Sequence, residues 1–112
     1  MGADEILQAL RAVAEPTRLR VLELLIGWEG PRTGPLRSGE RGLCLCDLEL
    51  LVGLSHALVC HHLRILREAG VVESEKRGRW TVYRARPEPL AHAARRLAEL
   101  AASHSRHDSR AA

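Results

Sequence analysis

Phenylalanine is absent from this chain of 112 residues, and aromatic side chains make up only 3% of it. Leucine, valine and alanine must therefore fill the interior, which favours helices. No apolar run approaches the length of a membrane span, and the N-terminus lacks the regions of a secretory signal, so we expect a cytoplasmic protein. Three cysteines, an odd number, favour free thiols with metal or redox chemistry over a disulfide.

The length is that of one domain, 1–112, with a core small enough that we expect a homodimer to complete it. The net charge of +3 and the pI of about 9.1 favour an acidic partner only weakly. Many proteins with no nucleic-acid role share such a charge.

The stretch 43–70 predicts two short helices joined by a tight turn. The first, 46–52, is too short to be stable alone. Gly53 supplies the turn, Ser55 stands where an N-cap belongs, and Gly70 stands where a left-handed residue ends the second helix. This arrangement is typical of a DNA-reading helix-turn-helix.

At 100° per residue the second helix has an apolar side and a polar side. Val59, Leu63 and Leu66 lie on the apolar side with His62, which we expect to be a packed, hydrogen-bonded core residue. On or near the other side lie the residues that we expect to contact DNA: Ser55, His56, Cys60, His61 and Arg64.

Apolar periodicity predicts two helices before this unit, 4–13 and 17–26, separated at Glu15-Pro16, where Pro16 opens the second. Residues 27–42 are rich in glycine, proline and charge, which predicts a long loop. We favour a solvated insertion. The alternative is an extra DNA contact through Arg32, Arg37 and Arg41.

After Gly70, apolar residues flank a basic tip, which predicts a β-hairpin of two strands. A hairpin directly after a reading helix is the wing of a winged helix. We expect Arg77 and Arg79 to reach phosphates or the minor groove.

Residues 87–103 predict a last helix with an apolar repeat of three and four residues. We interpret its alanine-rich face as a dimer seam, formed with the first helix, over packing within the chain alone. The polar tail, 104–112, is expected to fray. The predicted fold is thus mainly α with a β-hairpin wing: four helices, the hairpin and a fifth helix.

Cys44 and Cys46 lie two apart at a helix start, where both sulfurs can point at one ion. The positive end of the helix dipole favours the thiolate, and thiolates select thiophilic ions over Mg²⁺ or Ca²⁺. The pair therefore predicts a metal or metalloid site.

The order of these parts resembles the ArsR/SmtB family of dimeric winged-helix repressors that sense metals. The resemblance is carried by Leu43-Cys44-Leu45-Cys46-Asp47-Leu48, by 55–70 and by 78–84. The first motif is similar to one found in arsenic, antimony, cadmium and lead sensors. The family implies an ion-free dimer that blocks transcription at an operator and is released when As(III) or Sb(III), or alternatively Cd(II), Pb(II) or Zn(II), binds.

The sequence leaves open which group is the third ligand beside Cys44 and Cys46. Some arsenic sensors of the family have a third cysteine where this chain has Glu49. Cys60 is one candidate for the third ligand, although its position on the outward face of its helix argues against it. The other options are Glu49, solvent, a buffer thiol, or binding by the two sulfurs alone. The family's zinc sensors have metal ligands on the last helix. Two of those positions match Pro87 and Pro89, which cannot bind a metal. His92, His104 and His107 are still present, so an altered zinc site is an alternative.

The sequence thus predicts a metal(loid)-responsive homodimeric repressor of double-stranded operator DNA, with no membrane association. A thiol redox-sensing repressor ranks lower, because disulfides between such close cysteines are strained. A protein-interaction module without operator binding is a further alternative. An enzyme is the least supported class, since nothing builds a pocket or an oxyanion site beside Cys60 and His61.

Overall fold

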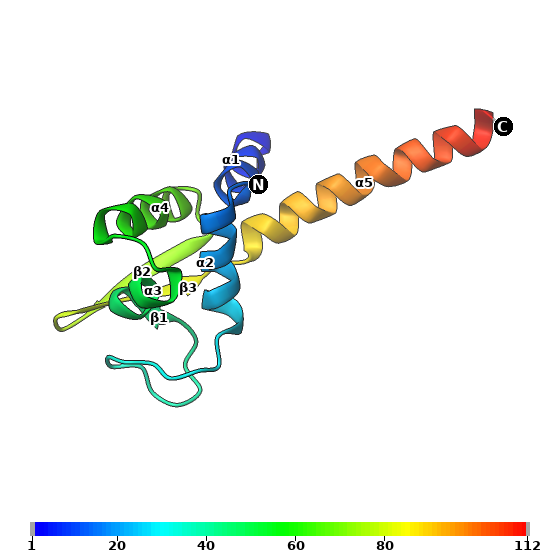
Figure 1. Ribbon diagram of the computed structural model, residues 1–112. Coiled ribbons are helices and arrows are strands. Elements are labelled where there is room, and N and C mark those ends of the chain that lie inside the picture. The colour runs from blue at the N-terminus through cyan, green and yellow to red at the C-terminus, as the bar shows by residue number, and fades with distance from the viewer. Residues whose placement is uncertain (1, 112) are drawn as a thin grey trace.

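The computed structural model describes the backbone of residues 2–111 and the side chains of residues 2–104. Five helices and a three-stranded sheet follow one another along the chain (Figure 1). In order, these are α1 (Ala3–Val13), α2 (Pro16–Gly27), β1 (Leu43–Cys44), α3 (Leu45–Val52), α4 (His56–Glu68), β2 (Val72–Arg77), β3 (Trp80–Ala85) and α5 (Glu88–Ala111). The predicted winged helix-turn-helix is confirmed.

The helix boundaries follow local chemistry. Pro16 opens α2, and the Glu15 side chain accepts a hydrogen bond from the Arg18 N–H. Ser55 caps α4 by accepting from the Leu58 N–H at 3.3 Å. Gly53 and Gly70, each at positive φ, end α3 and α4 as expected.

The sheet contains one strand more than the predicted hairpin. Its order is β1-β3-β2, and all its pairs are antiparallel. In β1, Leu43 pairs with Tyr83 and Cys44 with Val82, so the chain enters α3 directly from a strand. Two residues are too few for an alternating pattern to be visible in a sequence, which explains why this strand was not predicted.

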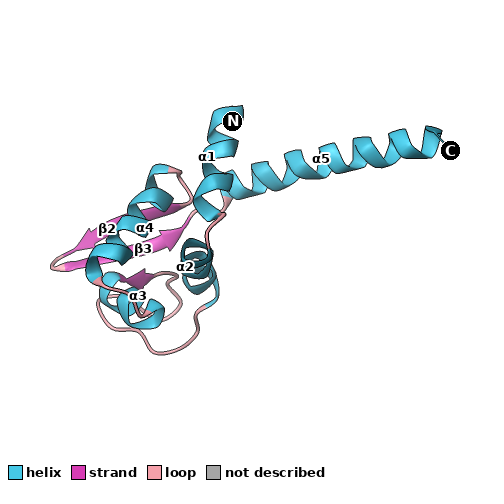
Figure 2. Cartoon of the chain, turned by 45° about the horizontal axis from the view of Figure 1, so that its top comes forward, coloured by secondary structure: helices cyan, strands magenta, loops and turns pink. Residues whose placement is uncertain are grey.

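Tertiary packing joins the helix-turn-helix to the sheet. In Figure 2, α4 lies over the β2–β3 hairpin and α1 packs against the first turns of α5. The core is almost entirely aliphatic, as the composition predicts, and Tyr83 is its buried aromatic residue. Its largest fully buried side chains are Val21, Leu43, Leu48, Val59, Leu63, Leu66, Val71, Val72 and Val82.

The last helix is longer than predicted. It starts at Glu88 and continues beyond Ser103, through the segment expected to fray, to Ala111. Neither glycine nor proline occurs after Pro89 to interrupt it. The helix projects from the body, and the molecule measures 61 × 28 × 25 Å (Figure 1). Among the described residues, no helix has the length and hydropathy needed to cross a membrane.

The start of β1 depends on a glycine. Gly42 has a φ of 115°, and a Cβ at this position would lie 2.5 Å from the Tyr83 carbonyl oxygen of β3. Gly39 also has a positive φ, of 88°, but a Cβ there would contact nothing. Alanine substitutions at Gly42 and Gly39 therefore separate the energetic cost of backbone strain from that of a steric clash.

We expect Gly42→Ala to lower the free energy of unfolding by about 2–4 kcal/mol, because strain adds to a clash with backbone. Gly39→Ala, which carries the strain alone, should cost about 1 kcal/mol. Urea denaturation of both variants measures the difference. Equal losses would contradict a close approach of Gly42 to β3.

Candidate functional site

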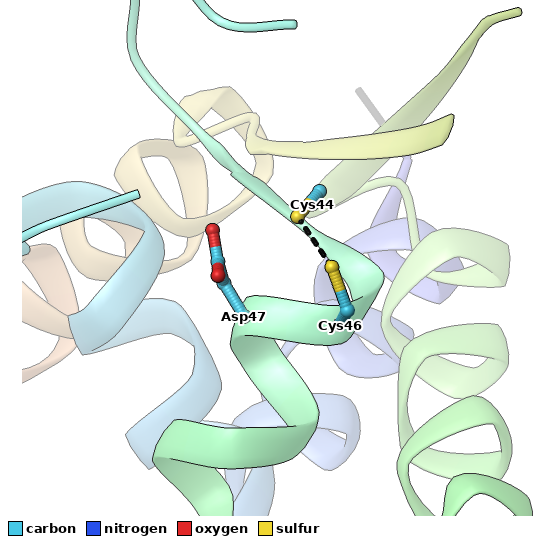
Figure 3. A group of neighbouring side chains, drawn as sticks. All are labelled: Cys44, Cys46 and Asp47. Carbon is cyan, nitrogen blue, oxygen red and sulfur yellow. Dashed lines mark hydrogen bonds between the residues drawn. The ribbon is translucent and has the colours of Figure 1, made fainter. Parts of the chain in front are cut away.

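Cys44 and Cys46 lie side by side at the junction of β1 and α3 (Figure 3). Cys44 is the last residue of the strand and the N-cap of the helix, and Cys46 lies in the first helical turn. Their sulfurs are 3.0 Å apart, and both thiols are free. Cys44 is buried and Cys46 is half-buried, so one of the two thiols is accessible from solvent.

Asp47 completes a group of three possible metal ligands. One of its carboxylate oxygens and the two sulfurs all lie within 4.8 Å of one another. Asp47 is only 6% exposed, which is unusual for a carboxylate, and it accepts hydrogen bonds from the Thr33 N–H at 2.8 Å and the Thr33 hydroxyl at 2.9 Å. Two sulfurs and one oxygen suit a thiophilic or borderline ion, not Mg²⁺ or Ca²⁺.

Thr33 is a neighbour of the thiols that sequence reasoning missed. Its hydroxyl oxygen lies 3.4 Å from the sulfur of Cys44 and 3.4 Å from the sulfur of Cys46. The residue comes from the loop, eleven positions before Cys44, and no motif marks it. Asp47, in contrast, stands inside the thiol motif and had a visible signal.

Burial, more than the helix dipole, controls the Cys44 thiol. Desolvation raises the pKa of Cys44, and the neighbouring Cys46 thiol raises it further, while Thr33 opposes the shift. This differs from the expectation that the helix start favours the thiolate. An ion that binds Cys44 must therefore displace a firmly held proton.

The other candidate ligands lie elsewhere. Cys60 is not part of the group formed by Cys44, Cys46 and Asp47; its sulfur is 3.5 Å from Nε2 of His56, one turn away on α4. The Glu49 carboxylate contacts the other ring nitrogen of His56, at 2.5 Å. Glu49 is thus directed at the reading helix and not at the thiol pair.

The predicted DNA-reading residues lie on α4 much as the helical wheel indicates. Ser55, His56, His61 and Arg64 are exposed, and Cys60 is half-buried. The inward assignment of His62 is confirmed: Nδ1 of its ring lies 3.2 Å from the Arg18 guanidinium.

The two wing arginines have different surroundings. Arg79, in the turn of the hairpin, is exposed, and its guanidinium stacks over Trp80 at 5.4 Å. Arg77 is half-buried and forms ion pairs with Glu75 of its own strand and, at 2.8 Å, with Glu40 of the loop. The contact with Glu40 was not predicted.

The histidines of α5 form no cluster of three metal ligands with other described side chains. His92 is half-buried and His104 is exposed. The side chain of His107 lies outside the described residues.

A helix-turn-helix with a wing, and a thiol pair at the start of its first helix, define a winged-helix DNA-binding regulator. The pattern of the family described as "Bacterial regulatory protein, arsR family" matches residues 36–74. The chain is 33% identical over 93 residues to the arsenical resistance operon repressor of Escherichia coli, covering 83% of this chain and 69% of that one. It therefore belongs to the arsR family, whose members are regulatory proteins and not enzymes.

Further similarities agree with this placement. The arsenic resistance transcriptional regulator ArsR1 of Pseudomonas putida is 36% identical over 78 residues, which cover 70% of this chain and about half, 52%, of that protein. An ArsR-like transcriptional regulator from Rhodococcus superposes with a TM-score of 0.73 at 26% identity, covering 95% of this chain and 88% of that chain. A homodimeric winged-helix domain from Mycobacterium bovis shares the fold, with a TM-score of 0.60 at 23% identity and coverages of 93% and 84%.

The raised pKa of Cys44 predicts how stability depends on pH. Since the thiol is harder to ionise when folded than when unfolded, its contribution is fully present below the usual thiol value of 9.0 and is lost as pH rises through the folded value. We expect the free energy of unfolding of the ion-free protein to fall more steeply between about pH 8 and pH 10 than that of Cys44→Ser.

Urea denaturation across this range is the measurement. Tyr83, whose pKa burial also raises, is present in both wild type and Cys44→Ser, so its contribution does not distinguish the two curves. Cys60→Ser is the matched control and should keep the steep fall. Parallel curves for wild type and Cys44→Ser would contradict the assigned cause.

Proposed function

We propose that this chain is a metal(loid)-responsive transcriptional repressor whose inducer binds Cys44 and Cys46. The observation that carries the proposal is the 3.0 Å separation of the two free thiols at the first turn of the helix-turn-helix. A ligand held there acts on the element that supports the reading helix. The arsenic-related names of two relatives support the same function.

The DNA-binding role rests on α4 and the wing. In the proposed complex, α4 enters the major groove with His56, His61 and Arg64 outward, and Arg79 reaches the backbone beside it. Ser55, Cys60 and Arg77 remain candidates for the same interface. Phosphate contacts make the affinity strongly dependent on salt.

The switch follows from the position of the thiols. Cys44 is fixed by pairing with Val82, whereas Cys46 belongs to α3, which connects to α4 through the short turn 53–55. Drawing both sulfurs onto one ion changes the start of α3 relative to the sheet. Release requires that the ion bind the released conformation more tightly, with a coupling of about 1–3 kcal/mol.

As(III) or Sb(III) is the proposed inducer, held by two sulfurs and completed by a third donor. Among the described residues, Asp47 is the carboxylate that lies within 4.8 Å of both sulfurs. It is proposed as the third ligand, which the sequence left open. The same oxygen favours the alternative of Cd(II), Pb(II) or Zn(II), which accept mixed sulfur and oxygen ligands. Cys60 is proposed as a DNA-facing residue and not as a ligand.

Dimerisation is proposed through α1 and α5. An apolar groove between these helices is lined by Ile6, Leu7, Leu10, Ala93, Leu97 and Leu100. Leu97 and Leu100 of α5 are 51% and 52% exposed. A second copy of this face would bury them, and two copies place two reading helices on an inverted repeat.

The inducer site is tested by gel shift, on a duplex that the ion-free protein selects from random DNA. We expect arsenite to release wild type and Cys60→Ser, and to leave Cys44→Ser/Cys46→Ser bound, because only the latter lacks both sulfurs. Parallel titrations with Cd(II) and Zn(II) rank the ions. Release of the double variant by arsenite would refute the site, and release of wild type by peroxide with metals chelated would favour the redox alternative.

The dimer surface is tested with charge on α5. Leu97→Glu/Leu100→Glu should weaken the dimer by at least about 100-fold, since each leucine contributes roughly 1.5–3 kcal/mol when buried. Ala98→Glu adds one negative charge on α5 away from this face and should leave the dimer intact. Light scattering measures the mass, and a dimeric double variant would contradict the surface.

A further inference from the structure

The loop 28–42 contacts both the thiol site and the wing. At one end, Thr33 donates two hydrogen bonds to Asp47 and lies against both sulfurs. At the other, Glu40 pairs with Arg77 of β2 at 2.8 Å and with Arg84 of β3 at 3.6 Å. The favoured expectation of a merely solvated insertion does not account for these contacts.

Arg32 connects the two ends of the loop. One nitrogen of its guanidinium donates to the Trp28 carbonyl at 2.6 Å, and the other donates to the Glu40 carbonyl at 3.3 Å. Because Arg32 immediately precedes Thr33, a shift of Thr33 moves the residue that holds Glu40. The guanidinium is occupied inside the loop, which argues against the alternative of a DNA contact by this residue.

Glu40 holds two wing arginines at once. The Arg77 guanidinium lowers the pKa of Glu40 below its ordinary value, and Arg84 adds to the effect. Glu75 contacts the same two arginines from β2, at 3.3 Å and 2.8 Å. Exposed ion pairs of this kind add little stability, but a network of four groups restricts where the guanidinium of Arg77 lies.

We propose that Thr33 and Glu40 are positioning residues through which the loop 28–42 couples ion binding at Cys44 and Cys46 to the wing. This inference rests on the proposed function and specifies how that site is regulated. It adds a second route to the one through α3 and α4.

The geometry at Thr33 supplies the first step. Its hydroxyl oxygen is equidistant from the two sulfurs, so it borders the space that a guest of both sulfurs enters. An ion bound by both sulfurs either displaces the Thr33 hydroxyl or lies in contact with it. Either event alters the two hydrogen bonds that Thr33 donates to Asp47. A Cβ added at Gly34, next along, would lie 3.4 Å from the Trp80 ring of β3, so the loop also approaches the hairpin there.

The second step is at Glu40. A displaced Thr33 carries Arg32 with it and removes the donor to the Glu40 carbonyl. The Glu40 carboxylate then no longer fixes Arg77 and Arg84, and Arg77 changes position relative to the DNA backbone. The wing therefore responds to the ion without any contact of its own with it.

The test measures how strongly arsenite weakens operator binding, and not only the affinity of the protein for either ligand. The ratio of operator dissociation constants with and without arsenite is measured for wild type, Glu40→Gln and Glu40→Asp, together with the affinity of each free protein for arsenite by calorimetry. We expect Glu40→Gln to lower the ratio at least about fivefold while its arsenite affinity stays within about twofold of wild type. Glu40→Asp keeps the charge and should restore part of the ratio.

Two further variants sharpen the result. Glu73→Gln is the matched control, because it removes the same charge from β2 at an exposed pair with Arg86 that the loop does not touch. Its ratio should equal that of wild type. Thr33→Val replaces the hydroxyl with a methyl group of similar size and should lower the ratio, as Glu40→Gln does. Thermal melting verifies that each variant is folded.

Each failure has its own meaning. A wild-type ratio in folded Glu40→Gln would overturn the loop pathway and leave the proposed function standing. An equal loss in Glu73→Gln would also overturn it, since wing charge in general would then set the ratio. No release of wild type by arsenite, Cd(II) or Zn(II) would refute the proposed function and this inference with it.

Discussion

The junction between β1 and α3 is the constraint on which the site depends. Cys44 belongs to both elements: its backbone pairs with Val82, and it also caps the helix that follows. The helix then places Cys46 in its first turn, which brings its sulfur to 3.0 Å from that of Cys44. Without the strand, the position of Cys44 would be that of a loop residue.

Burial and polarity oppose one another at this junction. Cys44 is fully buried and its desolvation favours the neutral thiol, whereas the half-buried Cys46 and the carboxylate of Asp47 bring polar character to the same place. Thr33 resolves the conflict by satisfying both carboxylate oxygens, and no described buried side-chain nitrogen or oxygen atom lacks a hydrogen-bond partner. The buried carboxylate is thereby satisfied in the absence of an ion.

Much of the fold could be predicted from the sequence, because its signals are local. The apolar periodicity of α4, the cap at Ser55 and the left-handed glycines at Gly53 and Gly70 each involve neighbours within one turn of helix. The basic hairpin after Gly70 follows from the same kind of pattern. Of the site, the adjacency of Cys44 and Cys46 was accessible for the same reason.

The rest could not be predicted, because it depends on contacts far apart in the chain. Thr33 and Glu40 lie in a loop without periodicity, and their partners in the thiol site and the wing are eleven or more residues away. The two-residue strand β1 has no pattern of its own and forms only because β3 offers an edge. The balance between helix dipole and burial at Cys44 likewise needs the packed structure, since burial is a property of the whole fold.

The hollow beside the thiols has a consequence for observing the protein. Cys46 lines it together with Trp80 and Arg79 of the hairpin, and the Trp80 ring also lies close to the loop at Gly34, where an added Cβ would meet it at 3.4 Å. The only other indole, that of Trp28, donates to the Pro31 carbonyl near the start of the same loop. Both indoles of the chain thus lie in or beside the loop that borders the thiols, and their ultraviolet emission is an intrinsic optical label for the site that requires no added dye.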